Sequence, residues 1–133
     1  MPKTHDDGSG TVGATETSFA ILAHLKEHDG ATVTAIATAL SLSKSTVYNH
    51  LRTLNRLGYV VKENKTYHLG LQFLDLGNAA RDRYGLYEVA KAEIDDLVSS
   101  IGEHGYVMVE EMSRGVYIYQ SKTARGIQTD SHI

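Results

Sequence analysis

The chain has 133 residues, enough for one small domain or for one domain and part of another. Hydrophobic residues make up 41% of it, as in ordinary globular proteins, and it has no cysteine, which excludes disulfides and thiolate metal sites. The N-terminus lacks the apolar core of a secretory signal, and no apolar run approaches the roughly 20 residues that a membrane span needs. We therefore expect a cytoplasmic protein without a membrane partner.

The net charge of −3 argues against a basic protein that coats nucleic acid, yet the charge is unevenly distributed. Between positions 44 and 65, five basic residues accompany the single acid Glu63, which gives this segment +4 and leaves −7 for the rest of the chain. A basic surface on an acidic body is typical of a small DNA-binding protein. An ordinary solvated helix face would carry similar charges, so charge alone leaves both interpretations open.

The N-terminal part predicts an arm and a helix. Residues 1–16 are polar, rich in Gly and Thr, and without periodicity, which predicts a disordered arm. Apolar spacing predicts a first helix over about 18–28, with Thr17 or Ser18 as its cap. Asp29-Gly30 should end this helix, because Gly accepts the left-handed C-terminal conformation.

A helix-turn-helix pattern follows. A short second helix is predicted over about 35–40, with Thr34 as its cap, and Ser41-Leu42-Ser43 then forms a turn in which Leu42 plugs the space between the helices. The third helix is predicted over about 44–57, with Ser43 as its N-cap. Its apolar residues recur at helical spacing and should face inward: Val47, Leu51, Leu54 and Leu57.

A β-hairpin should come next. The runs 59–63 and 66–69 are strand-like, and Asn64-Lys65 between them forms a two-residue turn, since Asn tolerates the positive φ that such turns need. Gly70 ends the hairpin. A hairpin directly after a recognition helix is the pattern of a wing, here over about 61–67.

The C-terminal part predicts a linker helix and the start of a second domain. A helix over 71–84 is apolar on more than one side, which suggests a subunit contact and hence a homodimer. An amphipathic helix over about 86–101 is followed by strands over 106–109 and 116–119, joined around Ser113-Arg114-Gly115. These elements leave one face unfilled, so we expect this α+β unit to be incomplete.

The outward face of the third helix carries side chains suited to DNA. The side-chain amide of Asn49 fits adenine, and the forked guanidinium group of Arg52 fits guanine or phosphate. Tyr48 can form a hydrogen bond to a phosphate or pack on a thymine methyl group. Lysines near the wing tip would reach the phosphate backbone or the adjacent minor groove. The candidate DNA-binding residues are Lys44, Ser45, Thr46, Tyr48, Asn49, Arg52, Lys62 and Lys65.

Two other classes of function compete with DNA binding. The alternative is a winged-helix protein–protein interaction module without DNA binding, which the net acidity and the incomplete second unit favour slightly. A ligand-binding or enzymatic role of the C-terminal segment is the third hypothesis.

Enzyme signatures are weak. The run from Ser41 to Lys44 fits the S-x-x-K pattern of penicillin-recognising enzymes, but the accompanying motifs are missing. His24 and His28 have a spacing that could bind zinc, yet no third ligand follows nearby, so two surface histidines are expected. We expect no enzyme, no catalytic or metal site, and no cofactor.

Three motifs together resemble the IclR family of transcriptional regulators. They are the recognition-helix run 43–54, which contains Lys44-Ser45-Thr46, then Leu57-Gly58-Tyr59-Val60, and then Tyr67-His68-Leu69-Gly70. Segments 71–77 and 86–90 are similar to the family's next two helices, so the resemblance spans 18 to about 125. The family commonly has Pro before the Lys, where this chain has Ser43, and a serine caps the helix equally well.

The resemblance implies a fold that is mainly α with small β: a winged helix-turn-helix, a linker helix and a truncated α+β segment. The corresponding ranges are a disordered arm 1–16, a DNA-binding domain 17–70, a linker helix 71–84, and the beginning of an effector-binding domain 85–133. It also implies a double-stranded DNA operator, dimers or tetramers, and action as a repressor or activator. The family's ligand pocket is built largely from residues that should follow Ile133, so a small-molecule effector is implied for the full-length protein.

Overall fold

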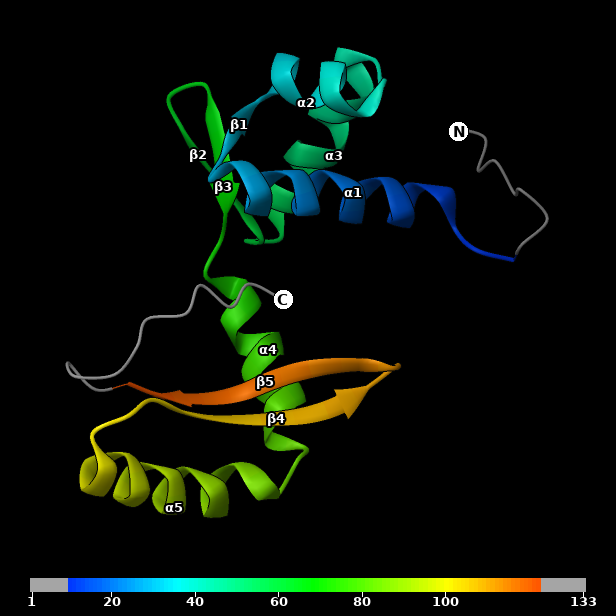
Figure 1. Ribbon diagram of the computed structural model, residues 1–133. Coiled ribbons are helices and arrows are strands. Elements are labelled where there is room, and N and C mark those ends of the chain that lie inside the picture. Colours follow the sequence, from blue (N-terminus) through cyan, green and yellow to red (C-terminus); the bar gives the residue numbers. More distant parts are fainter. Residues whose placement is uncertain (1–9, 123–133) are drawn as a thin grey trace. The chain divides into compact units, whose positions relative to one another are not determined.

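The computed structural model describes residues 10–122, and the contacts among residues divide the chain into two units between Asp75 and Leu76. The first unit holds helices α1 to α3 and a small sheet, and the second holds helix α5 and a β-hairpin (Figure 1). This is the predicted fold class, mainly α with small sheets. Among residues 10–122, every helix is too short or too polar to cross a lipid bilayer.

Helix α1 (Gly13–His28) begins five residues before the predicted start at Ser18. Its first turn is closed by the carbonyl oxygen of Val12, and no side chain caps it, so the predicted cap at Thr17 or Ser18 is wrong. Residues 13–16 of the predicted arm are therefore helical, while residues 1–9 lie outside the described residues. The predicted end is confirmed, because Asp29 and Gly30 both have positive φ, 50° and 100°.

Ser18 has a tertiary partner in place of the predicted cap role. The Ser18 hydroxyl does not turn back to cap the helix but lies 2.7 Å from Nδ1 of His50 in the third helix. Because His50 is 32 positions away, the local sequence around Ser18 does not indicate this contact. The local sequence indicates only that serine is a residue type that caps helices well.

Strand β1 (Ala31–Thr32) is an element that the sequence does not predict. It pairs antiparallel with β3 (Thr66–Leu69), which in turn pairs with β2 (Val60–Glu63), so the sheet has the order β1-β3-β2. Two residues are too few to display the alternation that marks a strand. β1 also changes the next helix cap: the Thr32 hydroxyl accepts a hydrogen bond from the Ala35 amide at 3.2 Å, so α2 (Val33–Leu40) starts earlier than predicted and Thr34 is not its cap.

Helix α3 (Lys44–Arg56) follows the sequence prediction closely. The Ser43 hydroxyl accepts a hydrogen bond from the Thr46 amide at 3.2 Å, which confirms the predicted cap. The inward row is confirmed for Val47, Leu51 and Leu54, which are all buried. It is wrong for Leu57, which is 60% exposed, because the helix ends at Arg56 and Leu57 leaves the row.

The predicted hairpin is confirmed as β2 and β3, with Asn64 at a φ of 56° in the turn. Val60 and Tyr67 are the buried residues that attach it to the core. After the hairpin the chain passes close to itself, since a Cβ atom on Gly70 would lie 2.5 Å from the carbonyl oxygen of Gly58. The Phe73 ring then packs edge-on against Tyr59, with the ring centroids 4.8 Å apart.

The core of the first unit lies among α1, α2, α3 and the sheet. It contains Ile21, Leu22, Leu25, Ala31, Ile36, Ala37, Val47, Leu51, Leu54, Val60 and Tyr67. The predicted plug Leu42 is partly buried and packs against this core. The three helices and the sheet therefore hold one another through a shared apolar centre.

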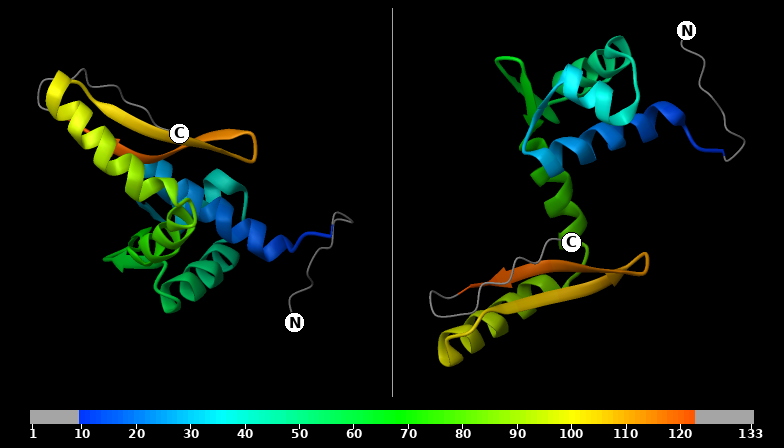
Figure 2. Two further views of the ribbon diagram at one scale, coloured as in Figure 1. Left: turned by 90° about the horizontal axis from the view of Figure 1, so that it is seen from below. Right: turned by 45° about the horizontal axis from the view of Figure 1, so that its top comes forward.

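The second unit contains helix α5 (Leu86–Ile101), which has the predicted bounds, packed along the hairpin of β4 (Gly105–Glu111) and β5 (Arg114–Ser121) (Figures 1 and 2). The hairpin turn is at Met112-Ser113, both with positive φ, rather than around 113–115 as predicted. Helix α4 (Gln72–Asp82) runs across the boundary between the units and has no buried residue.

Truncation of a side chain in the buried row should destabilise the first unit. Leu51 is fully buried, so Leu51→Ala should lower the free energy of unfolding by about 2–5 kcal/mol, because it leaves a cavity in the core. Leu57→Ala, at the exposed end of the same helix, is the matched control and should change it little. Urea denaturation followed by circular dichroism measures both, and equal losses would contradict the described packing.

Candidate nucleic-acid interface

The outer face of α3 presents most of the predicted DNA-binding residues together. Lys44, Ser45, Tyr48, Asn49 and Arg52 are exposed, and they share the side of the helix opposite the buried row. Their spacing of one and three residues keeps them on one face of a helix. Because the inner face is fixed in the core, this polar face points away from the body of the unit.

Thr46 lies differently from its predicted neighbours. It is half-buried, and its hydroxyl accepts a hydrogen bond from the Ser43 hydroxyl at 2.8 Å. Ser43 also accepts from the Thr46 amide, so the two side chains form one cap at the start of α3. Thr46 thus takes part in positioning the first turn of the helix.

The wing lysines are exposed and lie near one residue of α3. Lys62 on β2 and Lys65 in the turn line a surface pocket with Tyr48, so the structure brings these three predicted residues together. Asn49 lies elsewhere, beside a second pocket between α1 and α3.

The end of α3 is attached to the start of the wing by specific bonds. The side-chain amide of Asn55 donates a hydrogen bond to the carbonyl oxygen of Val60 at 2.9 Å. The Tyr59 amide donates to the carbonyl oxygen of Leu54 at 2.9 Å, across Gly58, whose φ is 87°. These bonds fix the position of the wing relative to α3.

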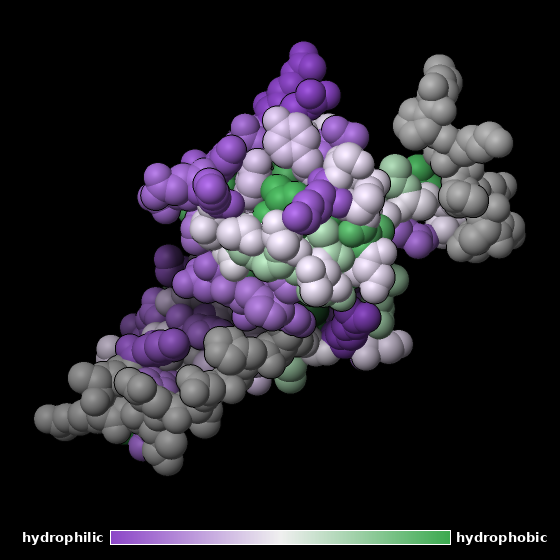
Figure 3. All heavy atoms as spheres, turned by 90° about the horizontal axis from the view of Figure 1, so that it is seen from above, coloured by the Kyte–Doolittle hydropathy of each residue, from purple (hydrophilic) through white to green (hydrophobic). Residues whose placement is uncertain are grey.

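The charge on this surface favours a polyanion. α3 contains no acidic residue, and the carboxylate of Glu63 on the wing has its Oε2 atom 3.9 Å from Nε2 of His68. The space-filling view of the molecule from above shows hydrophilic side chains around a pale area with small hydrophobic parts (Figure 3). The arrangement can offer amide, guanidinium, hydroxyl and ammonium donors to phosphates and base edges.

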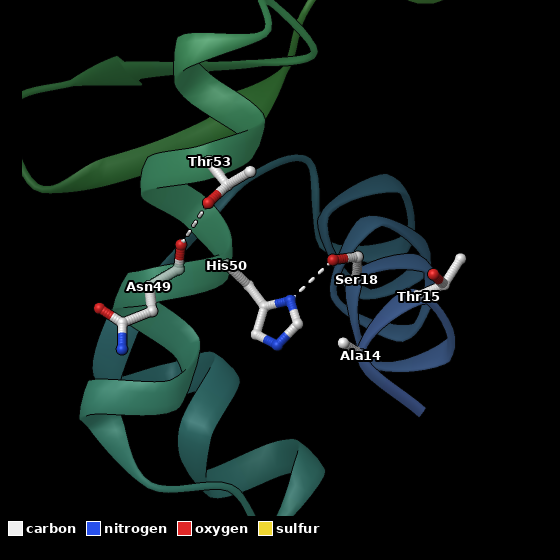
Figure 4. Close-up of a pocket in the computed structure, with 6 residues that line it drawn as sticks. All are labelled: Ala14, Thr15, Ser18, Asn49, His50 and Thr53. Carbon is white, nitrogen blue, oxygen red and sulfur yellow. Dashed lines mark hydrogen bonds between the residues drawn. The ribbon is translucent and has the colours of Figure 1, made fainter. Parts of the chain in front are cut away.

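His50 is a residue of this region that the sequence analysis missed. Its ring points from α3 toward Ser18 on α1, whereas the Asn49 side chain points away from α1 (Figure 4). Burial lowers the pKa of His50 below its usual range, because the charged imidazolium is poorly solvated there. The only signal in the sequence is its place beside the buried row, next to Leu51.

The two histidines that the sequence placed at zinc-compatible spacing contact each other. The rings of His24 and His28 stack with centroids 4.0 Å apart, and Nδ1 of His28 lies 3.0 Å from the carbonyl oxygen of His24. Within residues 10–122, no three histidine or acidic side chains gather closely enough to hold a metal ion.

Comparisons with known proteins agree with this geometry. The IclR helix-turn-helix domain family matches residues 14–64, which contain nearly all of α1, all of α2 and α3, and β2, the first strand of the wing. A probable HTH-type transcriptional regulator, ArcR, from Halobacterium salinarum is 31% identical over 114 residues, which cover 85% of this chain and 43% of that protein. The chain belongs to the IclR family.

Two further proteins are similar to parts of this chain. The glycerol operon regulatory protein of Streptomyces griseus is 40% identical over 76 residues, 56% of this chain and 30% of that protein. The crystal structure of an IclR transcriptional regulator from Alicyclobacillus acidocaldarius has a TM-score of 0.71 at 26% identity, covering 91% of this chain and 51% of that chain. The chain spans less than half the length of the curated relatives that it matches.

The partly buried position of His50 predicts a pH dependence of stability. Because its folded-state pKa lies below the unfolded value of about 6.5, the unfolded chain takes up the proton first as the pH falls. This contribution to stability should be complete above about pH 6.5 and should be lost as the pH falls toward the folded-state pKa. Urea denaturation at several pH values should therefore show a steeper acid loss in the natural chain than in His50→Asn.

The same pKa can be measured directly. A titration of the His50 ring by NMR should give a value below that of an unstructured histidine. A value at or above the unstructured one would contradict the partial burial of this side chain.

Proposed function

We propose that this chain is a sequence-specific DNA-binding transcriptional regulator, a repressor or activator, that acts in the cytoplasm. In this proposal α3 enters the major groove and the β2–β3 wing contacts the backbone. One observation supports it most: α3 buries Val47 and Leu51 completely while its opposite, polar face stays exposed. The family match and the regulators among its relatives support the same role.

The side chains of the outer face suggest a division of roles. Asn49 and Arg52 suit direct contacts with base edges, adenine for the amide and guanine for the guanidinium. Lys44 and Ser45 lie in the first turn of α3, where phosphate oxygens are favoured by the helix N-terminus. Lys62 and Lys65 would neutralise phosphates beside the major groove.

Recovery of genomic DNA fragments by the purified chain, followed by sequencing, should reveal a common site. Binding to a duplex of that site should weaken steeply between about 50 and 200 mM salt, because counterions are released from neutralised phosphates. A protein-docking module would recover no common site, and its partner binding would respond little to salt.

Substitution of Arg52 tests the base-reading role within the same assay. Arg52→Ala should lower the affinity for the recovered site by about 1–3 kcal/mol and relax the preference at one base pair. Arg114→Ala, an equal loss of charge on β5 in the second unit, is the matched control and should bind as the natural chain does. Unchanged binding by Arg52→Ala would remove Arg52 from the interface.

We further propose that the chain acts as a homodimer, with tetramers as an alternative assembly, and that α4 supplies much of the contact. Leu74 and Leu76 on α4 are 57% and 56% exposed, and Leu71 just before the helix is 81% exposed. Exposed leucines at this density are typical of a surface that another subunit covers. A dimer would also present two recognition helices to two half-sites.

Sedimentation of the full chain tests the dimer. Leu74→Glu should convert dimers into monomers at micromolar concentration, since it places a charge in an apolar contact. Gln72→Glu adds a carboxylate to a polar, exposed position of the same helix and should leave the dimer intact. A monomeric natural chain, or a dimeric Leu74→Glu variant, would overturn the proposal.

The domain boundaries and the effector remain proposals for the whole protein. We assign DNA binding to the first unit and regard the α5–β5 segment as the start of an effector-binding domain. A small-molecule effector is proposed only for the full-length protein, because the chain spans 43% of the length of the ArcR relative.

A further inference from the structure

A surface pocket on the first unit lies between three elements of the candidate interface. Its walls are the start of α2, the middle of α3 and the wing, and its lining residues include Thr32, Thr34, Tyr48, Lys62, Lys65 and Tyr67. We propose that this pocket binds one phosphodiester group of the DNA backbone, which the wing and α3 contact together. This proposal rests on the proposed function, and it names the residues that contact the backbone phosphate.

The charge of the pocket fits a single oxyanion. Of the described residues that line it, two are lysines and none is acidic. Strand pairing explains why the nearest acid does not neutralise them: Lys62 stands opposite Tyr67, whereas Glu63 stands opposite Thr66. Successive side chains of a strand point to opposite faces, so Glu63 belongs to the other face of the wing, where it lies 3.9 Å from His68.

One lysine is already held in place for such a contact. The Lys62 ammonium lies over the ring of Tyr67, 5.6 Å from its centroid, and Tyr67 is itself 5% exposed in the sheet. A cation above an aromatic face is attracted by the ring and loses some of its freedom before any ligand arrives. Ordering Lys62 in advance reduces the entropy lost when it binds a phosphate.

Two hydroxyl groups complete the set of donors. Tyr48 is 46% exposed and reaches this pocket from α3, and Thr34 is exposed at the start of α2. The Thr32 hydroxyl is engaged as the cap of α2, where it accepts a hydrogen bond from the Ala35 amide, and Tyr67 is buried in the sheet. We therefore assign Tyr48 and Thr34 as neutral donors to phosphate oxygens, and Tyr48 is a backbone contact rather than a contact with a thymine methyl group.

A shared phosphate has a consequence for how the duplex is read. The wing and α3 would hold the same backbone group, so the pocket would set the position of α3 along the groove. Asn49 and Arg52, one and four residues beyond Tyr48, would then meet base pairs at a fixed distance from that phosphate.

Methylphosphonate scanning tests the pocket. The full chain is titrated with a duplex selected from a random library, in which each phosphate in turn is replaced by a neutral methylphosphonate. For the natural chain, one position in each half-site should weaken binding about tenfold, the loss expected of a charge-assisted contact. In Lys62→Met and Tyr48→Phe the same replacement should cost much less, because the partner is already gone.

Matched variants separate the pocket from general effects. Lys91→Met removes an exposed lysine of α5 and should keep the profile of the natural chain. Lys62→Met should reduce the salt dependence of binding by about one counterion. Tyr48→Phe and Thr34→Val remove only hydroxyl groups, so they should weaken binding and leave its salt dependence unchanged. Thermal melting of each variant confirms that it is folded.

The outcomes divide cleanly. Equal losses at every phosphate in the natural chain and in both pocket variants would overturn the pocket while leaving DNA binding intact. Failure of the natural chain to select any duplex would contradict both the proposed function and the assignment of the pocket to a phosphate. Stabilisation by submillimolar inorganic phosphate alone, lost in Lys62→Met, would show a site for free phosphate and overturn its assignment to the DNA backbone.

Discussion

The burial of one side of α3 is the constraint on which the candidate interface depends. Val47 and Leu51 have no exposed surface, and they lie in the core shared by α1, α2 and the sheet. A helix anchored along one stripe has no freedom to rotate, so its other stripe is presented to solvent by necessity. The polar residues of that stripe differ in chemistry, but their common direction has this single cause.

Hydrogen bonds at both ends of α3 fix its first turn and its position relative to the wing. At its start, Ser43 and Thr46 close the first turn, and at its end Asn55 holds the backbone of the wing. The charge of the chain acts over a longer range. Segment 44–65 carries +4 and the rest carries −7, so a duplex is attracted by one surface and repelled by the remainder. This distribution restricts the orientations in which the chain approaches DNA.

Local patterns predicted the parts of the fold that local physics determines. The span of α3, the Ser43 cap and the α5 helix were predictable because periodicity and capping chemistry act over a few residues. The parts that failed depend on distant partners. Ser18 bonds to His50 rather than capping α1, and β1 exists only because Ala31 and Thr32 meet β3. In the site, the outward direction of the α3 residues was predictable, whereas the meeting of Tyr48 with the wing lysines needed the tertiary fold.

The ring contact between Tyr59 and Phe73 decides where the first unit can be cut. Tyr59 lies three residues after the end of α3, and Phe73 belongs to the first turn of α4, so the linker helix contributes a side chain to the packing beside the wing. A shortened protein that stops at Gly70 would lose this ring and leave Tyr59 uncovered. An excised DNA-binding fragment therefore has to extend into α4, to about Asp75, although the wing itself ends at Leu69.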